Sequence, residues 1–124
     1  MKGYRVLVCG DRDWTDTRLV REALHGLPVG TILINGGARG ADQIAQAVGR
    51  ALGFWVVTYE PSSKMWPAAG NIRNGWMLDE GKPQAVIAFH DDLSMSRGTK
   101  DMVGKARAAG LPVRLISHGG EVHA

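Results

Sequence analysis

Apolar runs of strand length alternate with amphipathic runs of helix length along this chain of 124 residues. An unbroken apolar run of about four to eight residues is typical of a strand that is buried on both faces of a sheet. Strands that are joined by helical crossovers run parallel, because each crossover returns the chain to the same end of the sheet. The apolar runs lie at residues 4–10, 31–35, 54–60, 84–90 and 111–117.

The segments between these runs carry apolar residues at helical spacing. They predict helices over 16–26, 41–52, 68–81 and 99–110, and a loop over 61–67. Thr15 or Asp16 can cap the first helix, and Gly53 can end the second. We therefore expect an α/β protein, a Rossmann-like three-layer sandwich with a five-stranded parallel sheet and helices on both faces. The predicted domain spans residues 1–117, followed by a loose, flexible C-terminal tail at 118–124.

Cysteine content, hydropathy and charge narrow the class of protein. The single cysteine, Cys9, lies in an apolar run and is expected to be a small buried side chain in a reducing, cytoplasmic location. No window reaches the roughly 18 apolar residues of a membrane span, and the first residues turn polar too early for a signal peptide. The net charge of +3 suits an anionic ligand and also weak contact with nucleic acid.

Polar, glycine-containing segments follow each of the first four predicted strands. They read GDRDWTD at 10–16, NGGARGAD at 35–42, MWPAAGNIRNGWM at 65–77 and HDDLSMSRGT at 90–99. The carboxyl ends of parallel strands meet at one edge of the sheet, and ligands of such folds bind there. We therefore expect the four segments to converge, and this convergence points to a site more strongly than any single motif.

The segment at 35–42 is either a phosphate cradle or a plain turn from strand to helix. Its glycines allow a sharp turn and an anion-binding helix start, and its arginine can pair with a phosphate or with a carboxylate of the protein. Its aspartate can bind a sugar hydroxyl or cap the helix. Neither the G-x-G-x-x-G fingerprint nor a P-loop lysine is present. The candidate ligand-binding residues here are Gly36, Gly37, Ala38, Arg39, Gly40 and Asp42.

The other segments add candidates of the same kinds. An arginine, an amide or a glycine-led helix start suits an anionic group. Trp14 either stacks on a base or covers the edge of the core, and Asp101 either caps the fourth helix or binds a sugar hydroxyl. The further ligand-binding candidates are Gly10, Arg12, Trp14, Asn71, Arg73, Asn74, Gly98 and Thr99.

The remaining reactive residues form weaker patterns. His90, Asp91 and Asp92 are a possible metal-binding run, but no second cluster has ligand spacing, so no metal is expected. His118 and His123 fall in the predicted tail and are expected to be exposed. The G-x-S-x-G elbow of serine hydrolases is absent, and no cofactor is expected.

Taken together, these motifs resemble those of the SLOG superfamily, in the branch called YspA/cpYpsA-related. The matching stretches are GDRDWTD at 10–16, GGARGAD at 36–42, Trp66, AAGNIRN and Met77 within 68–77, GT and DMV within 98–103, and AGLPV at 109–113. The resemblance implies a Rossmann-like fold and a nucleotide or nucleotide-derived ligand, ADP-ribose-like or cyclic, with a role in phage or bacterial conflict. It also implies a homodimer.

The LOG phosphoribohydrolases, which cleave nucleoside monophosphates at the N-glycosidic bond, are a related group. They carry a P-G-G-x-G-T-x-x-E loop, of which Gly98 and Thr99 match the G-T, and Arg73 matches the arginine of their preceding helix. Met102 occupies the position of the catalytic glutamate, and Asp101 is one residue early and points about 100° away on a helix. In an enzyme of this type, Arg73 and Asp101 would be the catalytic residues.

Three functions remain open on this basis. The leading one is binding or sensing of a nucleotide-like small molecule, with backbone N–H groups on phosphate, Arg73 adding charge, and Trp14 or Trp66 stacking on a base. The first alternative is a nucleotide-processing N-glycosidic hydrolase of LOG type. The second is single-stranded nucleic-acid binding, as in the related DprA proteins, which four tryptophans permit but scattered lysines and arginines do not favour. No membrane partner is expected.

Overall fold

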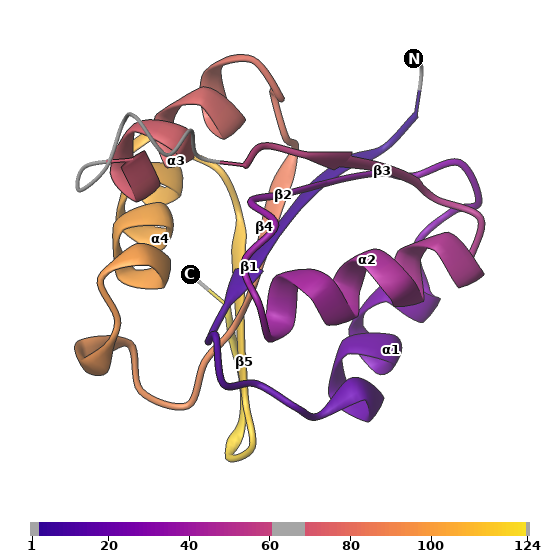
Figure 1. The fold of residues 1–124 in the computed structure, drawn as a ribbon, viewed down its shortest axis with the longest axis horizontal. Coiled ribbons are helices and arrows are strands. Elements are labelled where there is room, and N and C mark those ends of the chain that lie inside the picture. Colours follow the sequence, from indigo (N-terminus) through magenta and orange to yellow (C-terminus); the bar gives the residue numbers. More distant parts are fainter. Residues whose placement is uncertain (1–2, 61–68, 124) are drawn as a thin grey trace.

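Six strands form one sheet in the computed structural model, which describes residues 3–60 and 69–123 (Figure 1). Their bounds are β1 Arg5–Gly10, β2 Ile32–Asn35, β3 Trp55–Thr58, β4 Ala85–Phe89, β5 Val113–Ser117 and β6 Gly120–His123. The order across the sheet is β3-β2-β1-β4-β5-β6. Strands β1 to β5 run parallel, and β6 runs antiparallel to β5.

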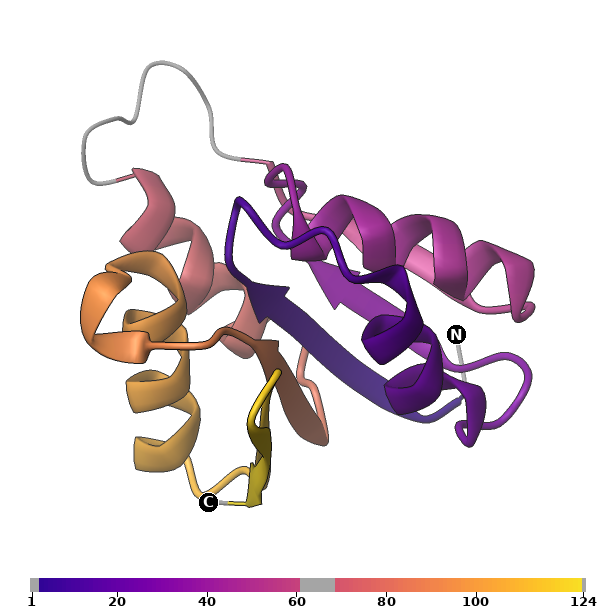
Figure 2. The same cartoon turned by 90° about the horizontal axis from the view of Figure 1, so that it is seen from below.

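Helices cover both faces of this sheet within the described part of the chain. They are α1 (Thr17–His25), α2 (Ala41–Ala51), α3 (Ala69–Asp79) and α4 (Gly98–Ala108), with a short 3-10 helix η1 (Leu93–Met95) before α4. Figure 2 shows α1 and α2 together on one face and α3 and α4 on the other. The face changes after β3, because β1 to β3 progress in one direction across the sheet and β4 to β5 progress in the other. The result is a three-layer α/β arrangement consistent with a Rossmann-like fold.

Side chains of the central strand alternate between the two helical layers. Val6 and Val8 belong to the apolar cluster with α1 and α2, and Leu7 and Cys9 belong to the cluster with α3 and α4. Burial on both faces explains why this run of the sequence is apolar without interruption. The expectation that Cys9 is a buried small side chain is confirmed.

Local signals set the helix ends. The carboxylate of Asp16 accepts a hydrogen bond from the backbone N–H of Leu19 at 3.1 Å and so caps α1. Gly53, just beyond the end of α2, has a φ of 81°, a conformation that glycine adopts without strain. Asp16 is one of the two caps that the sequence offered for this helix, and Gly53 was predicted to end α2.

The sheet is larger than predicted and is not purely parallel. Residues 120–123, expected to belong to a loose tail, form β6 and pair with β5. All four residues of β6 are exposed, so no apolar pattern marks them as a strand. The predicted loop at 61–67, including Trp66, lies outside the described residues. Among the helices that the structure describes, none is both long and apolar enough to cross a membrane.

Candidate functional site at the switch in strand order

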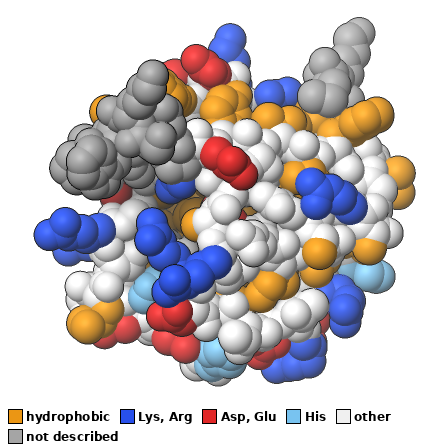
Figure 3. Space-filling view, viewed as in Figure 1, with side chains coloured by type: hydrophobic (Ala, Val, Ile, Leu, Met, Phe, Trp, Pro, Cys, Tyr) orange, Lys and Arg blue, Asp and Glu red, His pale blue; other side chains and the backbone are white. Residues whose placement is uncertain are grey.

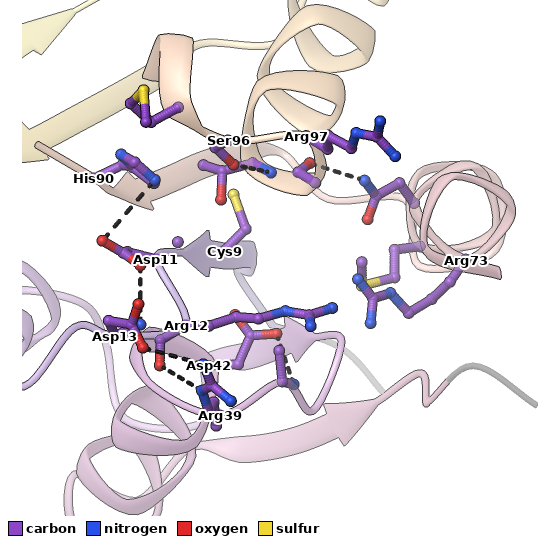
Figure 4. Close-up of a pocket in the computed structure, with 17 residues that line it drawn as sticks. Cys9, Asp11, Arg12, Asp13, Arg39, Asp42, Arg73, His90, Ser96 and Arg97 are labelled. Carbon is purple, nitrogen blue, oxygen red and sulfur yellow. Dashed lines mark hydrogen bonds and ion pairs between the residues drawn. The ribbon is translucent and has the colours of Figure 1, made fainter. Parts of the chain in front are cut away.

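A hollow of about 400 Å³ opens at the carboxyl ends of β1 and β4 (Figure 4). These strands are neighbours, but the chain continues from them toward opposite edges of the sheet. Such a switch in strand order leaves a crevice in which parallel α/β folds bind their ligands. The lining comes from the loops after β1, β2 and β4, from α3 and from the start of α4.

The predicted site residues divide into four groups. Those that line the hollow are Gly10, Arg12, Ala38, Arg39, Asp42, Arg73, Asn74, Gly98 and Thr99. Asn71 and Asp101 line a second hollow beside it. Gly36, Gly37 and Gly40 shape the β2–α2 loop behind the lining, and Trp14 lies in the core.

The β2–α2 loop wraps around the carboxylate of Asp42. Oδ2 of Asp42 accepts hydrogen bonds from the backbone N–H groups of Gly36 at 3.0 Å and Ala38 at 3.3 Å. The N–H of Gly37 donates to the side-chain oxygen of Asn35 at 2.8 Å. These N–H groups, assigned to phosphate from the sequence, therefore bind oxygens of the protein itself. The carboxylate takes the place of an external anion at the N-terminus of α2.

Asp42 is only 4% exposed, and burial raises its pKa to about 6. The N–H groups of Ala38 and Gly36 and the charges of Arg73 and Arg12 oppose this shift, because they stabilise the ionised carboxylate. Its charge therefore changes near neutral pH, although an aspartate in water ionises well below that.

Arg73 reaches from α3 into the hollow toward this loop (Figure 4). Its Nη1 donates to the backbone oxygen of Gly36 at 3.1 Å, and its Nε is buried without a hydrogen-bond partner among the described residues. Gly36 makes this approach possible, since a Cβ there would lie 2.6 Å from Cζ of Arg73. Burial lowers the pKa of Arg73 while Asp42 raises it, and a guanidinium remains charged in proteins.

Asp11 organises the turn after β1. Its Oδ1 accepts the N–H of Asp13 at 2.9 Å, and Oδ1 of Asp13 lies 3.1 Å from Nη2 of Arg39. Arg39 also donates to the backbone oxygen of Arg12 at 3.3 Å. Arg39 thus pairs with a carboxylate of the chain, whereas the Arg12 side chain extends over the hollow toward Arg73 (Figure 4).

Asn74 joins α3 to the start of α4. It is 2% exposed, and its Nδ2 donates to the backbone oxygen of Gly98 at 3.1 Å and to Oδ2 of Asp101 at 3.0 Å. Oγ of Ser96 accepts the N–H of Thr99 at 3.0 Å and caps the first turn of α4. The amide of Asn74 therefore positions the start of α4. Asp101, which is bonded to the same amide, lines the second hollow and not the first.

The residues 4–65 match the model of the YspA, cpYpsA-related SLOG family. The chain belongs to this family. It is also 38% identical over 119 residues to the Gene 61 protein of Mycobacterium phage D29. The aligned region covers 88% of this chain and 93% of that protein. The matched residues include the turn after β1 and the β2–α2 loop, which form two walls of the hollow.

Several residues of the SLOG hollow were not singled out from the sequence as ligand-binding. They are Cys9, Asp11, Asp13, Met77, His90, Met95, Ser96 and Arg97. Asp11 and Arg97 lie inside segments that the strand ends had marked, so their position after a strand was the available signal. The sequence did not show which members of each segment face the hollow.

His90 faces Asp11 across the hollow. It is buried, its Nδ1 accepts the N–H of Asp92 at 3.0 Å, and its Nε2 lies 4.0 Å from Oδ2 of Asp11. Because Nδ1 accepts, the neutral ring carries its proton on Nε2, directed at this carboxylate. The three side chains of the run 90–92 therefore have different partners. Asp92 caps η1, and Asp91 pairs with His118. Within residues 3–60 and 69–123, no three His, Cys, Asp or Glu are placed to hold a metal ion.

Two roles were open for Trp14, stacking on a base and covering the edge of the core, and the structure places it in the core. It is 4% exposed, its ring lies 5.7 Å from that of Phe89, and its Nε1 donates to the backbone oxygen of Asp16 at 3.1 Å. Trp14 does not line the hollow, so its place in the structure gives no support to base stacking there. His118, expected to be an exposed tail residue, is half-exposed and stacks on Trp14 at 4.7 Å.

Proposed function

We propose that this SLOG protein binds a nucleotide or a nucleotide-derived ligand in the hollow between the ends of β1 and β4. The observation that carries the proposal is the convergence of Arg12, Arg73 and Arg97 on one crevice at the switch in strand order. Guanidinium groups form paired hydrogen bonds with phosphate oxygens, which makes arginine well suited to this ligand class. Membership of the SLOG family is compatible with a nucleotide-related ligand.

The phosphate would lie between Arg12, Arg73 and the first turn of α4, rather than inside the β2–α2 loop. Asp42 already fills that loop and would repel a second anion placed there. Arg73 lines the hollow, so its guanidinium would donate hydrogen bonds to a phosphate oxygen placed there. The role of the β2–α2 loop is then to hold Asp42 and Arg73 in place.

Sugar and base would use the remaining walls. Asp11 and His90 offer an acceptor and a donor near one another, which suits a pair of hydroxyl groups. Asp42 and Asp101, first considered for this role, already accept hydrogen bonds from the protein. Met95 is 81% exposed and lines the hollow, so its flexible apolar side chain offers a surface for a base.

The residues at the positions of the LOG catalytic groups, Met102 and Asp101, favour binding over LOG-type hydrolysis. Met102 is fully buried in the core with α3 and α4. Asp101 accepts from Asn74 and pairs with Lys105 at 2.8 Å, so its carboxylate is engaged away from the first hollow. Single-strand binding is less favoured, because no tryptophan of the described residues lines the hollow.

The first test is a thermal-shift screen against AMP, GMP, cyclic AMP, NAD and ADP-ribose, followed by calorimetry. A ligand that binds only the folded state raises its melting temperature. Arg73→Ala is expected to weaken binding of a stabilising nucleotide at least about tenfold, because a charged hydrogen bond is lost. Arg21→Ala removes an exposed arginine of α1, outside the hollow, and is expected to bind like the wild type.

Two results would overturn this proposal. If none of the five nucleotides stabilises the protein, the ligand class is wrong. If Arg73→Ala melts cooperatively and binds as tightly as the wild type, the phosphate does not lie against Arg73. Release of free base from AMP or NAD, followed by chromatography, would instead support the hydrolase alternative.

A further inference from the structure

A second hollow of about 1170 Å³ adjoins the first on the side of α4. The two share a wall formed by Arg12, Arg73, Met95, Ser96, Arg97 and Gly98. Beyond that wall, the second hollow extends along the exposed side of α4. A ligand group held by the shared arginines therefore lies at the entrance to both spaces.

The charge of the second hollow is strongly one-sided. Among the residues that the structure describes, five cations line it, and one acid, Asp101. The cations are Arg12, Arg73, Arg97, Lys100 and Lys105. Nζ of Lys105 lies 2.8 Å from Oδ2 of Asp101, so these two charges compensate each other. Arg97 and Lys100 form no ion pair with any described residue and leave a surplus of positive charge. Figure 3 shows Lys and Arg side chains gathered between the start of α4 and the loop after β1.

Positive and negative side chains are more nearly equal in number in the first hollow. Its arginines face Asp11, Asp13 and Asp42, and Asp13 already pairs with Arg39. A single phosphate held there by Arg73 and Arg12 would leave the charges of Arg97, in the shared wall, and of Lys100, which lines only the second hollow, without an anion. Cations grouped in a hollow repel one another, and a second anion removes this repulsion.

We infer that the second hollow is an anion subsite, and that the ligand carries a diphosphate with its outer phosphoryl group beside Arg97 and Lys100. The inference rests on the proposed function and narrows its ligand class to nucleoside diphosphates and their derivatives. The shared wall favours directly linked phosphoryl groups, because Arg12, Arg73 and Arg97 lie between the two spaces. No bond is formed or broken in this binding step.

Calorimetry with matched pairs of probes tests the subsite: AMP against ADP, and GMP against GDP, at one ionic strength. The wild type is expected to bind the diphosphate of at least one pair about tenfold more tightly than the monophosphate. Lys100→Ala is expected to remove most of this difference, because it lowers the affinity for the diphosphate much more than the affinity for the monophosphate. Lys100 is exposed, so its removal leaves the core intact.

Arg107→Ala is the matched control, since it removes another exposed cation of α4 that does not line either hollow. It is expected to retain the preference for the diphosphate. Equal affinity for both members of each pair would overturn the subsite and leave the proposed function standing. Equal losses of both affinities in Lys100→Ala would overturn it too, because a distant charge effect acts on any anion.

Inorganic pyrophosphate and phosphate separate this inference from the proposed function. If no nucleotide binds but pyrophosphate binds more tightly than phosphate and depends on Lys100, the nucleotide proposal fails and the diphosphate subsite stands. A single-stranded oligonucleotide that competes fully with ADP, with a steep dependence on salt, would overturn the small-molecule ligand in favour of a nucleic-acid backbone.

Discussion

Gly40 lies where the start of α2 crosses the loop that follows β1. Its φ is 78°, and a Cβ at this position would overlap the backbone oxygens of Asp11 and Arg12. Gly40→Ala is therefore expected to lower the free energy of unfolding by about 1–3 kcal/mol, through backbone strain and displacement of the loop. Urea unfolding followed by circular dichroism measures this change.

Gly104→Ala is the matched change at a glycine without these constraints. Gly104 lies on the exposed face of α4, and, apart from its chain neighbours and the backbone of its own helix, no described atom lies within 4 Å of where its Cβ would be. Alanine there is expected to raise the free energy of unfolding by about 0.5–1 kcal/mol, because it favours the helix. Equal effects of the two substitutions would mean that Gly40 is not held by its contact with the β1 loop.

At the scale of elements, His118 joins parts of the chain that no local pattern connects. It lies between β5 and β6, its Nδ1 is 2.9 Å from Asp91 in the loop after β4, and its Nε2 is 3.1 Å from Asp16 at the start of α1. The hydrogen bond to Asp91 is the largest of the effects that raise the pKa of His118, and Asp16 adds to it. The stabilising contacts are complete below the ordinary histidine pKa and are lost as pH rises through the raised one.

Asp91→Asn is expected to lower the pKa of His118 toward its ordinary value, because it removes the main anionic partner. An NMR titration of the ring protons of His118 measures the shift. Asp92→Asn provides the control, since Asp92 caps η1 through Ser94 and does not contact His118. An unchanged titration of His118 in Asp91→Asn would show that the β5–β6 connection is not anchored to the β4 loop in solution.

At the scale of the whole molecule, Asp42 couples stability to pH. Its pKa of about 6 lies above the ordinary value of 3.8, so ionisation is less favourable in the folded protein than in the unfolded chain. Its contribution is complete below the ordinary pKa and is lost as pH rises through about 6. Asp42→Asn keeps an oxygen for the two loop N–H groups but cannot ionise. The stability of Asp42→Asn relative to the wild type is expected to rise by about 2 kcal/mol between pH 4 and pH 7.

Urea unfolding of both proteins at several pH values measures this difference. Other carboxylates contribute equally to the two curves, so subtraction isolates Asp42. A difference that stays constant across this range would show that Asp42 ionises in the folded protein as it does in the unfolded chain.

The helices and the parallel strands could be predicted because the spacing of apolar residues along the chain shows which side chains are buried. Val6, Leu7 and Val8 must all be apolar, since their strand lies between two helical layers. The β6 strand could not be predicted in this way. Its only large apolar side chain, Val122, is 59% exposed, and the strand is held by backbone pairing with β5 and by the contact between Glu121 and Arg114 at 2.8 Å.

For this protein, the sequence by itself determined the fold class, the family and the edge of the sheet on which arginines and aspartates gather. Only the tertiary structure decided which hydrogen-bond donor pairs with which acceptor and which side chains enter the core. Asp42 fills the loop that the sequence offered to phosphate, Arg73 packs over Gly36, and Trp14 enters the core. The physical reason is that hydrophobic spacing is repeated along the chain, whereas a buried donor or acceptor pairs with the group that folding brings within about 3 Å of it.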